Sequence, residues 1–455
     1  MSTCDILISG DDFDQLMSHL YPGDHDEHGA VLKAGVVRDG AELRLLVRSV
    51  TPARAGTDYV ESKIGYRALH PTFIHRQITQ CRDEGLAYLA VHNHDCDDRV
   101  GFSAIDIASH ERGYPALRDI GKGVPVGALV FGRRSAQADI WLPDGNRLSL
   151  RELKVIGRSL RRLRPAPAPT RSSLPSFDRQ VRMFGDAGQE LLRASKIAVI
   201  GLGGIGSLVA EYLGRLGVGE LVLIDPDVIE DTNLSRVVGA MSSDVASGAL
   251  KTTIAARHVC ELDDGKFVHE IADDVAKLSV ALKLRDCDYL FLAADSMRAR
   301  LVFNALVHQY LIPGVQLGAK VRTDAVGALD DAMSAVREVR PGHGCLWCNQ
   351  LIDPAQLAIE AKTDAERKAQ AYGTHASAPS VITLNAVAAA HAVNDFLFYF
   401  LGIREDEAAA TYHHFHYLRG FPSRVMPRRD AECRECGADG RFARGDAVPL
   451  PGLDK

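Results

Sequence analysis

Residues with the types and spacing needed to hold a phosphate lie between positions 196 and 236. A short apolar strand, Ile197 to Ile200, runs directly into GLGGIGS, whose glycines are Gly201, Gly203, Gly204 and Gly206. Glycines permit a tight turn that approaches a phosphate closely, and the helix expected to follow points its amide end at it. A second apolar strand, LVLID, ends at Asp225, 24 residues past Gly201 and well placed for a ribose. The stretch predicts a nucleotide-binding α/β unit.

Further polar side chains follow this second strand. A glycine turn alone serves dehydrogenases, methyltransferases and ATP-dependent enzymes, and a dinucleotide site needs little beyond the ribose acid. Here DPDVIEDTNLSR supplies Asp227, Asn233 and Arg236, and GALKT supplies Lys251. Amide and cationic groups beyond a phosphate-binding turn suit a triphosphate whose leaving pyrophosphate needs charge neutralisation.

A second set of reactive residues lies near the N-terminus. The strand pattern LAYLAVHNHD ends in His92 and His94, and alternation along a strand points both imidazoles the same way. Asp106 follows 12 residues after His94, in the first turn of a helix that Ser103 would cap. Two imidazoles and a carboxylate are ligands that zinc prefers, with a fourth position left for water. The alternative is a surface histidine cluster beside an unrelated helix cap.

Four of the nine cysteines form two CxxC pairs, Cys345 with Cys348 and Cys433 with Cys436. This usage suits metal binding in a reducing cytoplasm better than a disulfide framework. Four thiolates give a closed tetrahedral site, so the pairs predict a structural zinc that ties the C-terminal tail to its domain. A redox role for either pair is the alternative.

The elements that must position these residues fall into two regions. At 455 residues the chain is long enough for two to four domains. Residues 1–160 predict two strands around the turn RDGAE and a helix from Pro71 to Glu84, followed by the strand that ends in the histidine pair. Residues 161–176, rich in proline and arginine, predict an extended linker. Residues 177–455 hold the glycine turn and both cysteine pairs. In the N-terminal region His25, His28 and His110 lie close in sequence to the motif residues and are expected to be exposed.

Composition excludes several other classes of protein. A net charge of −6 gives no reason to expect nucleic acid as the main partner. No run of about 18 apolar residues suggests a membrane span. The N-terminus carries four acids within 14 residues and no basic region, which argues against a signal peptide. We therefore expect a cytoplasmic enzyme of the α/β class.

The N-terminal pattern resembles the JAMM/MPN metalloprotease family, whose motif is HxH, a spacer and SxxD, with a glutamate from an early strand. The matching residues are His92, His94, Ser103 and Asp106, with Glu27 in EHGAVLKAG as the glutamate. The resemblance implies an α/β zinc peptidase. Glu27 would be the general base on a zinc-bound water, and Ser103 would help to hold the oxyanion.

The C-terminal region resembles the ThiF/MoeB and ubiquitin-activating adenylation family. An RQ segment precedes the glycine turn, D-x-D and N-L-x-R follow the second strand, and YLFLAAD ends a later strand. The resemblance implies a Rossmann-like, doubly wound domain that binds ATP and Mg²⁺, with Asp225 on the ribose. The phosphates would be contacted by Asn233, Arg236 and Lys251. Asp295 would bind magnesium, and Arg179 would reach the triphosphate of a neighbouring subunit, which requires a homodimer.

The acyl acceptor is left open by the cysteine positions. Thioester-forming activating enzymes carry a cysteine in the crossover region, but none occurs between Cys348 and Cys433, and Cys4, Cys81, Cys260 and Cys287 lie elsewhere. The enzyme would then pass its acyl-adenylate directly to a partner or use a hydroxyl. The candidate hydroxyls are Thr374, Ser377 and Ser380.

Together these patterns predict a bifunctional enzyme. One domain would adenylate the C-terminal glycine of a ubiquitin-like protein, and the zinc peptidase would process or deconjugate the same protein, with a conjugating-enzyme-like partner possible. The alternative is a sulfur-carrier adenylyltransferase whose peptidase processes the carrier. A third hypothesis is a binding module with a degenerate metal site and a nucleotide sensor.

Overall fold

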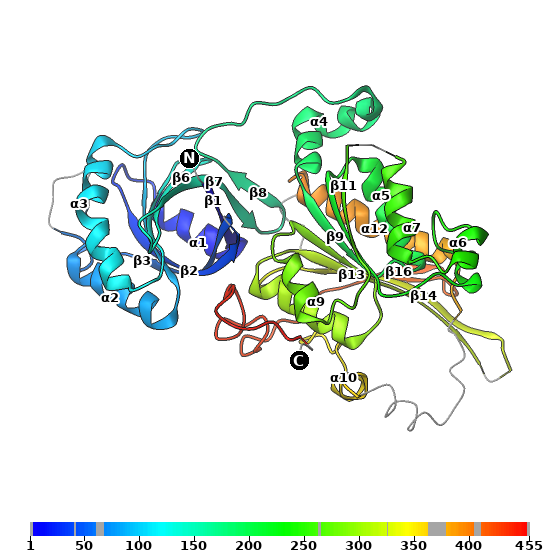
Figure 1. The fold of residues 1–455 in the computed structure, drawn as a ribbon. Coiled ribbons are helices and arrows are strands. Elements are labelled where there is room, and N and C mark those ends of the chain that lie inside the picture. The colour runs from blue at the N-terminus through cyan, green and yellow to red at the C-terminus, as the bar shows by residue number, and fades with distance from the viewer. Residues whose placement is uncertain are drawn as a thin grey trace. The chain divides into compact units, whose positions relative to one another are not determined.

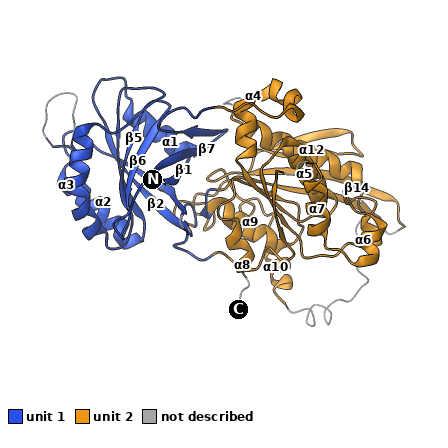
Figure 2. Ribbon diagram, turned by 45° about the horizontal axis from the view of Figure 1, so that its top comes forward, with its two compact units in different colours: residues 1–169, 309–311, 441–449 blue, residues 170–308, 312–440, 450–455 orange. Residues whose placement is uncertain are grey.

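The computed structural model describes residues 3–40, 42–60, 68–262, 265–324, 326–362, 379–404 and 411–452. Two of the candidate hydroxyls, Thr374 and Ser377, lie outside these residues. The chain divides into two compact units, which Figures 1 and 2 show. Unit 1 comprises residues 1–169, 309–311 and 441–449, and unit 2 comprises residues 170–308, 312–440 and 450–455.

Unit 1 is built on one eight-stranded sheet of order β1-β3-β2-β4-β5-β6-β7-β8. Because β1 also pairs with β7, the sheet closes on itself in a barrel-like form. The strands are β1 (Thr3–Ser9), β2 (Gly29–Asp39), β3 (Glu42–Pro52), β4 (Ala87–Asn93), β5 (Val126–Phe131), β6 (Ala136–Trp141), β7 (Arg147–Ile156) and β8 (Leu160–Leu163). The helices are α1 (Gly10–Leu20), α2 (Pro71–Glu84) and α3 (Ala104–Gly121).

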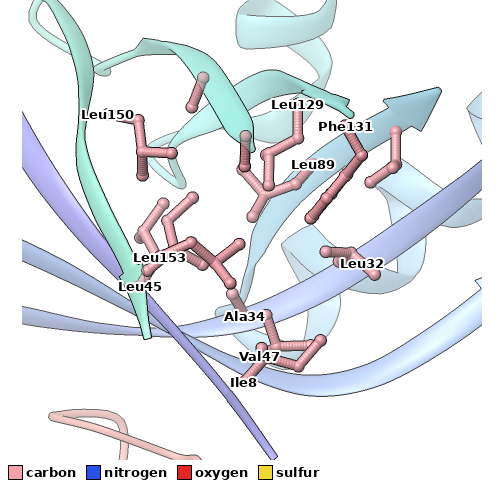
Figure 3. Close-up of a cluster of buried hydrophobic side chains, with 14 of the residues drawn as sticks. Ile8, Leu32, Ala34, Leu45, Val47, Leu89, Leu129, Phe131, Leu150 and Leu153 are labelled. Carbon is pink, nitrogen blue, oxygen red and sulfur yellow. The ribbon is translucent and has the colours of Figure 1, made fainter. Parts of the chain in front are cut away.

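Alternation along the strands of unit 1 divides its core into two layers. On β4, Leu89 points into one buried cluster (Figure 3). Val91 and Phe13 of α1 belong to the same cluster. Tyr88, the residue before Leu89, points to the opposite face and packs in a second cluster with Phe73 of α2. One face of the sheet therefore buries α1 and the other is covered by α2 and α3, which lie side by side (Figure 1).

Several local predictions for unit 1 are confirmed. The predicted helix from Pro71 to Glu84 is α2, and β2 and β3 pair across the predicted turn. The linker differs from the prediction at its start, because β8 pairs with β7 and already includes Arg161 and Arg162. The sequence pattern missed this strand because its arginines are stabilised from elsewhere, with Arg162 lying 3.6 Å from buried Glu152.

Unit 2 contains a second eight-stranded sheet, of order β11-β10-β9-β12-β13-β14-β15-β16. Its strands are β9 (Lys196–Ile200), β10 (Glu220–Ile224), β11 (Phe267–Ile271), β12 (Tyr289–Leu292), β13 (Gly314–Thr323), β14 (Leu329–Val339), β15 (Tyr412–His416) and β16 (Phe421–Val425). Its described helices are α4 (Asp178–Arg193), α5 (Gly204–Leu216), α6 (Ser242–Ser247), α7 (Lys251–Cys260), α8 (Leu278–Ala281), α9 (Met297–Gln309), α10 (Pro354–Glu360) and α12 (Ile382–Phe400).

The first five strands of this sheet, β11 to β13, run parallel, and the last three are antiparallel additions. Strand order reverses at β9. The chain continues from β9 to β10 on one side of it, and β12 pairs with β9 on the other side. In open α/β sheets such a switch point leaves a crevice beyond the carboxyl ends of the strands, where ligands bind. The Rossmann-like α/β prediction for this region is confirmed. None of the described helices combines the length and apolar character needed to cross a bilayer.

Candidate functional site

The turn between β9 and α5 depends on two of its glycines. Gly201 has a φ of +89°, and a Cβ there would lie 2.7 Å from the backbone nitrogen of Ala294. A Cβ at Gly206 would lie 1.7 Å from the carbonyl oxygen of Gly201. Gly203, the N-cap of α5, has open space where a Cβ would be. The turn is therefore packed tightly below and open above, toward the unsatisfied amides at the start of α5.

Asp225, at the end of β10, is held against this turn. Its carboxylate oxygens accept hydrogen bonds from the backbone N–H of Leu202 at 2.6 Å and of Asp227 at 2.9 Å. The residue is buried, and burial raises the pKa of its carboxyl group. Each carboxylate oxygen keeps a lone pair for a further donor such as a ribose hydroxyl.

Lys251 begins α7 beside these acids. Its Nζ lies 2.7 Å from Oδ2 of Asp227 and 3.9 Å from Oδ1 of Asp225. The two carboxylates therefore hold the ammonium group at the rim of the crevice and balance its charge. An incoming phosphate would find a cation already positioned.

A pocket of about 780 Å³ joins these residues to the carboxyl end of β12. One wall carries Gly201, Gly203, Gly204, Asp225, Asp227 and Lys251, all predicted from the sequence as nucleotide contacts. Asp295, three residues beyond β12, also lines it. On the opposite wall only Ser380 was named from the sequence, as a candidate hydroxyl. The polar members of this wall are Arg300, Gln316, Lys320, Arg337, Ser380 and Asn385.

Two arginines on that opposite wall have few partners. Nη1 of Arg337 donates to Oε1 of Gln316 at 2.6 Å, and Nη1 of Arg300 donates to the carbonyl oxygen of Leu351 at 2.8 Å. No carboxylate of the described residues lies within 4.0 Å of either guanidinium group. Burial, followed by the charge of Arg300, lowers the pKa of Arg337 to about 10. Paired cations in a half-buried pocket favour binding of an anion.

Three predicted phosphate contacts lie at the edge of this pocket or away from it. Asn233 is buried and its Oδ1 caps the short 3₁₀ turn η2 (Asp231–Asn233). The stem of Arg236 lies beside Gly204, where a Cβ would be 3.1 Å from Cδ of the arginine. Arg179, near the start of α4, is exposed and does not line the pocket of its own chain.

Asp295 also lines a second hollow, of about 470 Å³, formed with the start of α9 and with α10. There the carboxylate of Glu360 accepts hydrogen bonds from the backbone N–H of Met297 at 2.9 Å and of Arg298 at 3.0 Å. These amides belong to the first turn of α9, where a backbone N–H has no partner within the helix. Asp295 itself is exposed, and its carboxylate accepts no hydrogen bond among the residues described.

In unit 1 the structure brings together the predicted zinc ligands. One ligand atom from each of His92, His94 and Asp106 lies within 4.8 Å of the others. Nε2 of His92 lies 3.5 Å from Oδ1 of Asp106, and Nε2 of His94 lies 3.5 Å from Oδ2. Oε1 of Glu27 lies 3.8 Å from Nε2 of His94. The predicted capping role of Ser103 is confirmed, and its Oγ donates to Oδ2 of Asp106 at 2.7 Å.

The environment of this cluster fits a cation. Nε2 of His92 is buried without a hydrogen-bond partner, as expected for a nitrogen that binds a metal. Burial raises the pKa of Asp106, but the two histidines beside its carboxylate outweigh this effect and hold the pKa well below its ordinary range. Burial raises the pKa of Glu27. This residue lies two positions before the start of β2, not within a strand as the resemblance implied.

Two histidines expected to be exposed are in fact buried. His28 is 9% exposed, and its Nε2 lies 2.8 Å from Oδ1 of Asp24. His110 is 5% exposed, and its Nδ1 lies 2.9 Å from Oδ2 of Asp139. The sequence did not reveal these positions, because the acid that satisfies His110 lies 29 residues away on β6. His110 is the structural partner of a buried carboxylate, whereas the carboxylate beside His28 is exposed.

The four cysteines of the two CxxC pairs also meet. Their sulfur atoms lie within 4.8 Å of one another, with Sγ–Sγ distances of 3.5 Å for Cys345–Cys348, 3.8 Å for Cys345–Cys433 and 3.6 Å for Cys348–Cys436. Tetrahedral ligands at about 2.3 Å from zinc are separated by about 3.8 Å. The residues therefore fit one metal ion between two chain segments that lie far apart in the sequence.

Comparison with known proteins follows the same division. The profile of the ThiF family matches residues 177–436. The SAMP-activating enzyme E1 of Haloferax volcanii is 34% identical over 135 residues, covering 29% of this chain and 49% of that protein. A tRNA threonylcarbamoyladenosine dehydratase of Haemophilus influenzae is 36% identical over 128 residues, covering 28% and 48%. The sulfur carrier protein ThiS adenylyltransferase of Bacillus subtilis is 31% identical over 121 residues, covering 27% and 36%.

The chain spans about half the length of the first of these curated relatives. Among solved structures, a crystal structure of Escherichia coli MccB with ATP has a TM-score of 0.46 at 23% identity, covering 58% of this chain and 75% of that chain.

Proposed function

Because the chain belongs to the ThiF family, we propose that unit 2 uses ATP to adenylate the C-terminal carboxylate of a ubiquitin-like protein. The observation that carries this proposal is the pocket itself. It combines a glycine turn, an acid for a ribose, a lysine at the rim and a carboxylate at the end of β12. A dehydrogenase would need only the first two of these features.

In this proposal the triphosphate lies over the open side of the glycine turn. The amides at the start of α5 and Nζ of Lys251 would hold its oxygens, and Asp225 would accept from the ribose. Arg236, whose stem lies beside Gly204, would approach the same phosphates. Asp227 then keeps Lys251 in place through the 2.7 Å contact.

Asp295 fits a magnesium ion, since it is an exposed carboxylate at the pocket without a hydrogen-bond donor among the described residues. Bound there, magnesium would neutralise charge on the phosphates. An oxygen of the substrate carboxylate would attack the α-phosphorus, the bond from that phosphorus to the bridging oxygen would break, and pyrophosphate would leave. Arg300 and Arg337 would hold the substrate carboxylate or the leaving pyrophosphate from the opposite wall.

Arg179 supports a homodimer in this proposal. It is exposed and does not line the pocket of its own chain, so it would act on the nucleotide of a partner subunit. Arg179→Ala would then lower turnover while leaving the pocket of its own chain intact. Mixing that variant with an Asp295→Ala chain would restore part of the activity if the arginine acts in trans, and would restore none if it acts in its own subunit.

The relatives favour a protein C-terminus as the acyl substrate but differ among themselves. One relative is named for the activation of SAMP, one for adenylylation of the sulfur carrier protein ThiS, and one for the dehydration of threonylcarbamoyladenosine in tRNA. A sulfur-carrier pathway is therefore the alternative, and a thiocarboxylate on the carrier would identify it. We propose the modifier pathway because unit 1 adds a peptidase-like cluster that could act on the same C-terminus.

That cluster supports a second activity in unit 1. We propose that His92, His94 and Asp106 hold a zinc ion, which would supply an activated water, and that Glu27 takes the proton from that water. The substrate would be an extended precursor or a conjugate of the same modifier. Glu27→Gln should keep zinc bound and stop cleavage of a tail-extended modifier. Unchanged cleavage would reject Glu27 as the base.

The acceptor after adenylation can be read by mass spectrometry. Ser380 is the one candidate hydroxyl within the described residues; it lines the pocket and accepts a hydrogen bond from Asn385 at 3.2 Å. We propose incubating the chain with ATP and a Gly-Gly-terminated modifier, then treating it with hydroxylamine or thiol. An oxyester that disappears in Ser380→Ala would assign this residue. Release of free adenylate, with no covalent enzyme species, would instead support direct transfer to a partner.

A further inference from the structure

A third cluster of metal-type ligands lies in unit 2 and shares no residue with the two clusters described above. It is formed by His391 and Asp395, one turn apart on α12, and by His413 on β15. One ligand atom of each residue lies within 4.8 Å of the others. From this geometry we propose that His391, Asp395 and His413 bind a divalent transition-metal ion such as Zn²⁺, and so fasten helix α12 to the antiparallel edge of the sheet.

The spacing of the donor atoms suits such an ion. Nε2 of His391 lies 3.5 Å from Oδ2 of Asp395. Two ligands at about 2.0–2.1 Å from a tetrahedral zinc are separated by about 3.3 Å. The imidazole rings of His391 and His413 have centroids 4.5 Å apart, so small side-chain rotations bring both nitrogens to one point. Two imidazoles with one carboxylate form a donor set that Zn²⁺ accepts.

The hydrogen bonds around the cluster leave the inner donor atoms free. Nε2 of His391 is buried and has no hydrogen-bond partner. Nε2 of His413 is already paired with Oγ1 of Thr411 at 2.8 Å, which leaves Nδ1 as the ligand atom. Oδ1 of Asp395 accepts from Nη2 of Arg404 at 3.1 Å, which leaves Oδ2 facing His391. Ligating residues are commonly oriented by such outer partners.

Three arginines and two carboxylates surround the site. Arg404 and Arg340 are paired with the buried carboxylate of Glu338 at 2.8 Å each, and Arg404 reaches Asp395 as well. Arg424 of β16 lies opposite His413 of β15 in the strand pairing. The arginines oppose a cation, whereas the two carboxylates attract it. His391 retains 31% side-chain exposure, so an ion can enter from solvent and keep one water as a fourth ligand.

The test counts zinc by the chemistry of its ligands. His92→Asn and His94→Asn are introduced into every sample, so that the cluster of unit 1 contributes no zinc. Zinc is measured on the full, tag-free chain with a chromogenic chelator, before and after an organomercurial displaces zinc bound by thiolates. The zinc that the mercurial does not release is removed by a stronger chelator and counted.

In that background the chain should hold one zinc that the mercurial does not release. Asp395→Asn and His413→Gln should each lose it and keep the thiolate-bound zinc, which also shows that unit 2 is folded. His414→Asn, the adjacent residue on β15 and not a member of the cluster, should keep both. Equal amounts of mercurial-resistant zinc in Asp395→Asn, His414→Asn and their parent would overturn the proposal, as would none in the parent.

Discussion

Two glycines of the phosphate-binding turn should separate folding from nucleotide binding. A methyl group at Gly206 would lie 1.7 Å from the carbonyl oxygen of Gly201. Carbon and oxygen need about 3.3 Å, so the turn must open by more than 1 Å. Overpacking of this kind costs roughly 1–3 kcal/mol. A displacement of about 1 Å at a reaction centre lowers the reaction rate on the order of 100-fold. Gly206→Ala should therefore lose both stability and ATP binding.

Gly203 provides the matched control. It has a φ of −71°, and nothing lies within 4 Å of a Cβ built on it. Gly203→Ala should therefore change the free energy of unfolding by no more than about 0.5 kcal/mol. Its methyl group points into the space assigned to the phosphates. Loss of one hydrogen bond to a charged group costs about 1.5–3 kcal/mol, which corresponds to roughly 10- to 100-fold weaker ATP binding.

Urea unfolding and equilibrium dialysis with ATP measure the two quantities on the same samples. The reasoning predicts that Gly206→Ala loses both and that Gly203→Ala loses binding alone. A Gly203→Ala chain that binds ATP as tightly as the parent would show that the phosphates do not lie over this turn. A Gly206→Ala chain of unchanged stability would contradict the close packing beneath it.

Three further predictions address other parts of the molecule. Cys433→Ser should remove one zinc per chain and lower the melting temperature of unit 2, measured by metal analysis and calorimetry; unchanged zinc content would reject the four-cysteine site. The carboxylate of Asp139 is desolvated, yet hydrogen bonds from His110 and Arg147 lower its pKa from 3.8 to about 2. This interaction stabilises the fold above about pH 4 and is lost as the pH falls toward 2, so Asp139→Asn should cost about 2 kcal/mol at pH 7 and almost nothing at pH 2. Urea titrations at both pH values measure this, and an equal loss at both would contradict it. Arg337→Gln should reduce pyrophosphate exchange at least about tenfold with little loss of stability. The reason is that the substitution removes a cation that has no carboxylate partner in the pocket. Full exchange in this variant would exclude Arg337 from the site.

Features encoded in contiguous sequence could be predicted. The glycine turn, the cap at Ser103 and the helix α2 each follow from local backbone preferences, and the two CxxC pairs follow from metal-ligand spacing. The Rossmann-like fold was implied by the strand, glycine turn, helix and strand from β9 to β10 and by the resemblance to the ThiF family. These signals survive folding because they depend on neighbours within a few residues.

Features that depend on distant partners could not be predicted. Arg337 lies on β14 and reaches the pocket only because that strand is added next to β13. His413 meets the α12 residues His391 and Asp395 across some 20 residues of chain, with no motif to mark the pairing. The strand β8 was hidden by Arg161 and Arg162, whose charges are balanced by Asp14 of α1 and Glu152 of β7.

The central claim is that unit 2 makes an acyl-adenylate with Asp295 at the reaction centre. Exchange of labelled pyrophosphate into ATP, stimulated by a Gly-Gly-terminated ubiquitin-like protein, measures that step directly. The parent chain should show exchange that depends on the modifier's terminal carboxylate, and Asp295→Ala should abolish it while the fold is retained. Exchange at the parental rate in Asp295→Ala would contradict the assigned site, and exchange that persists with a C-terminally amidated modifier would contradict the reaction.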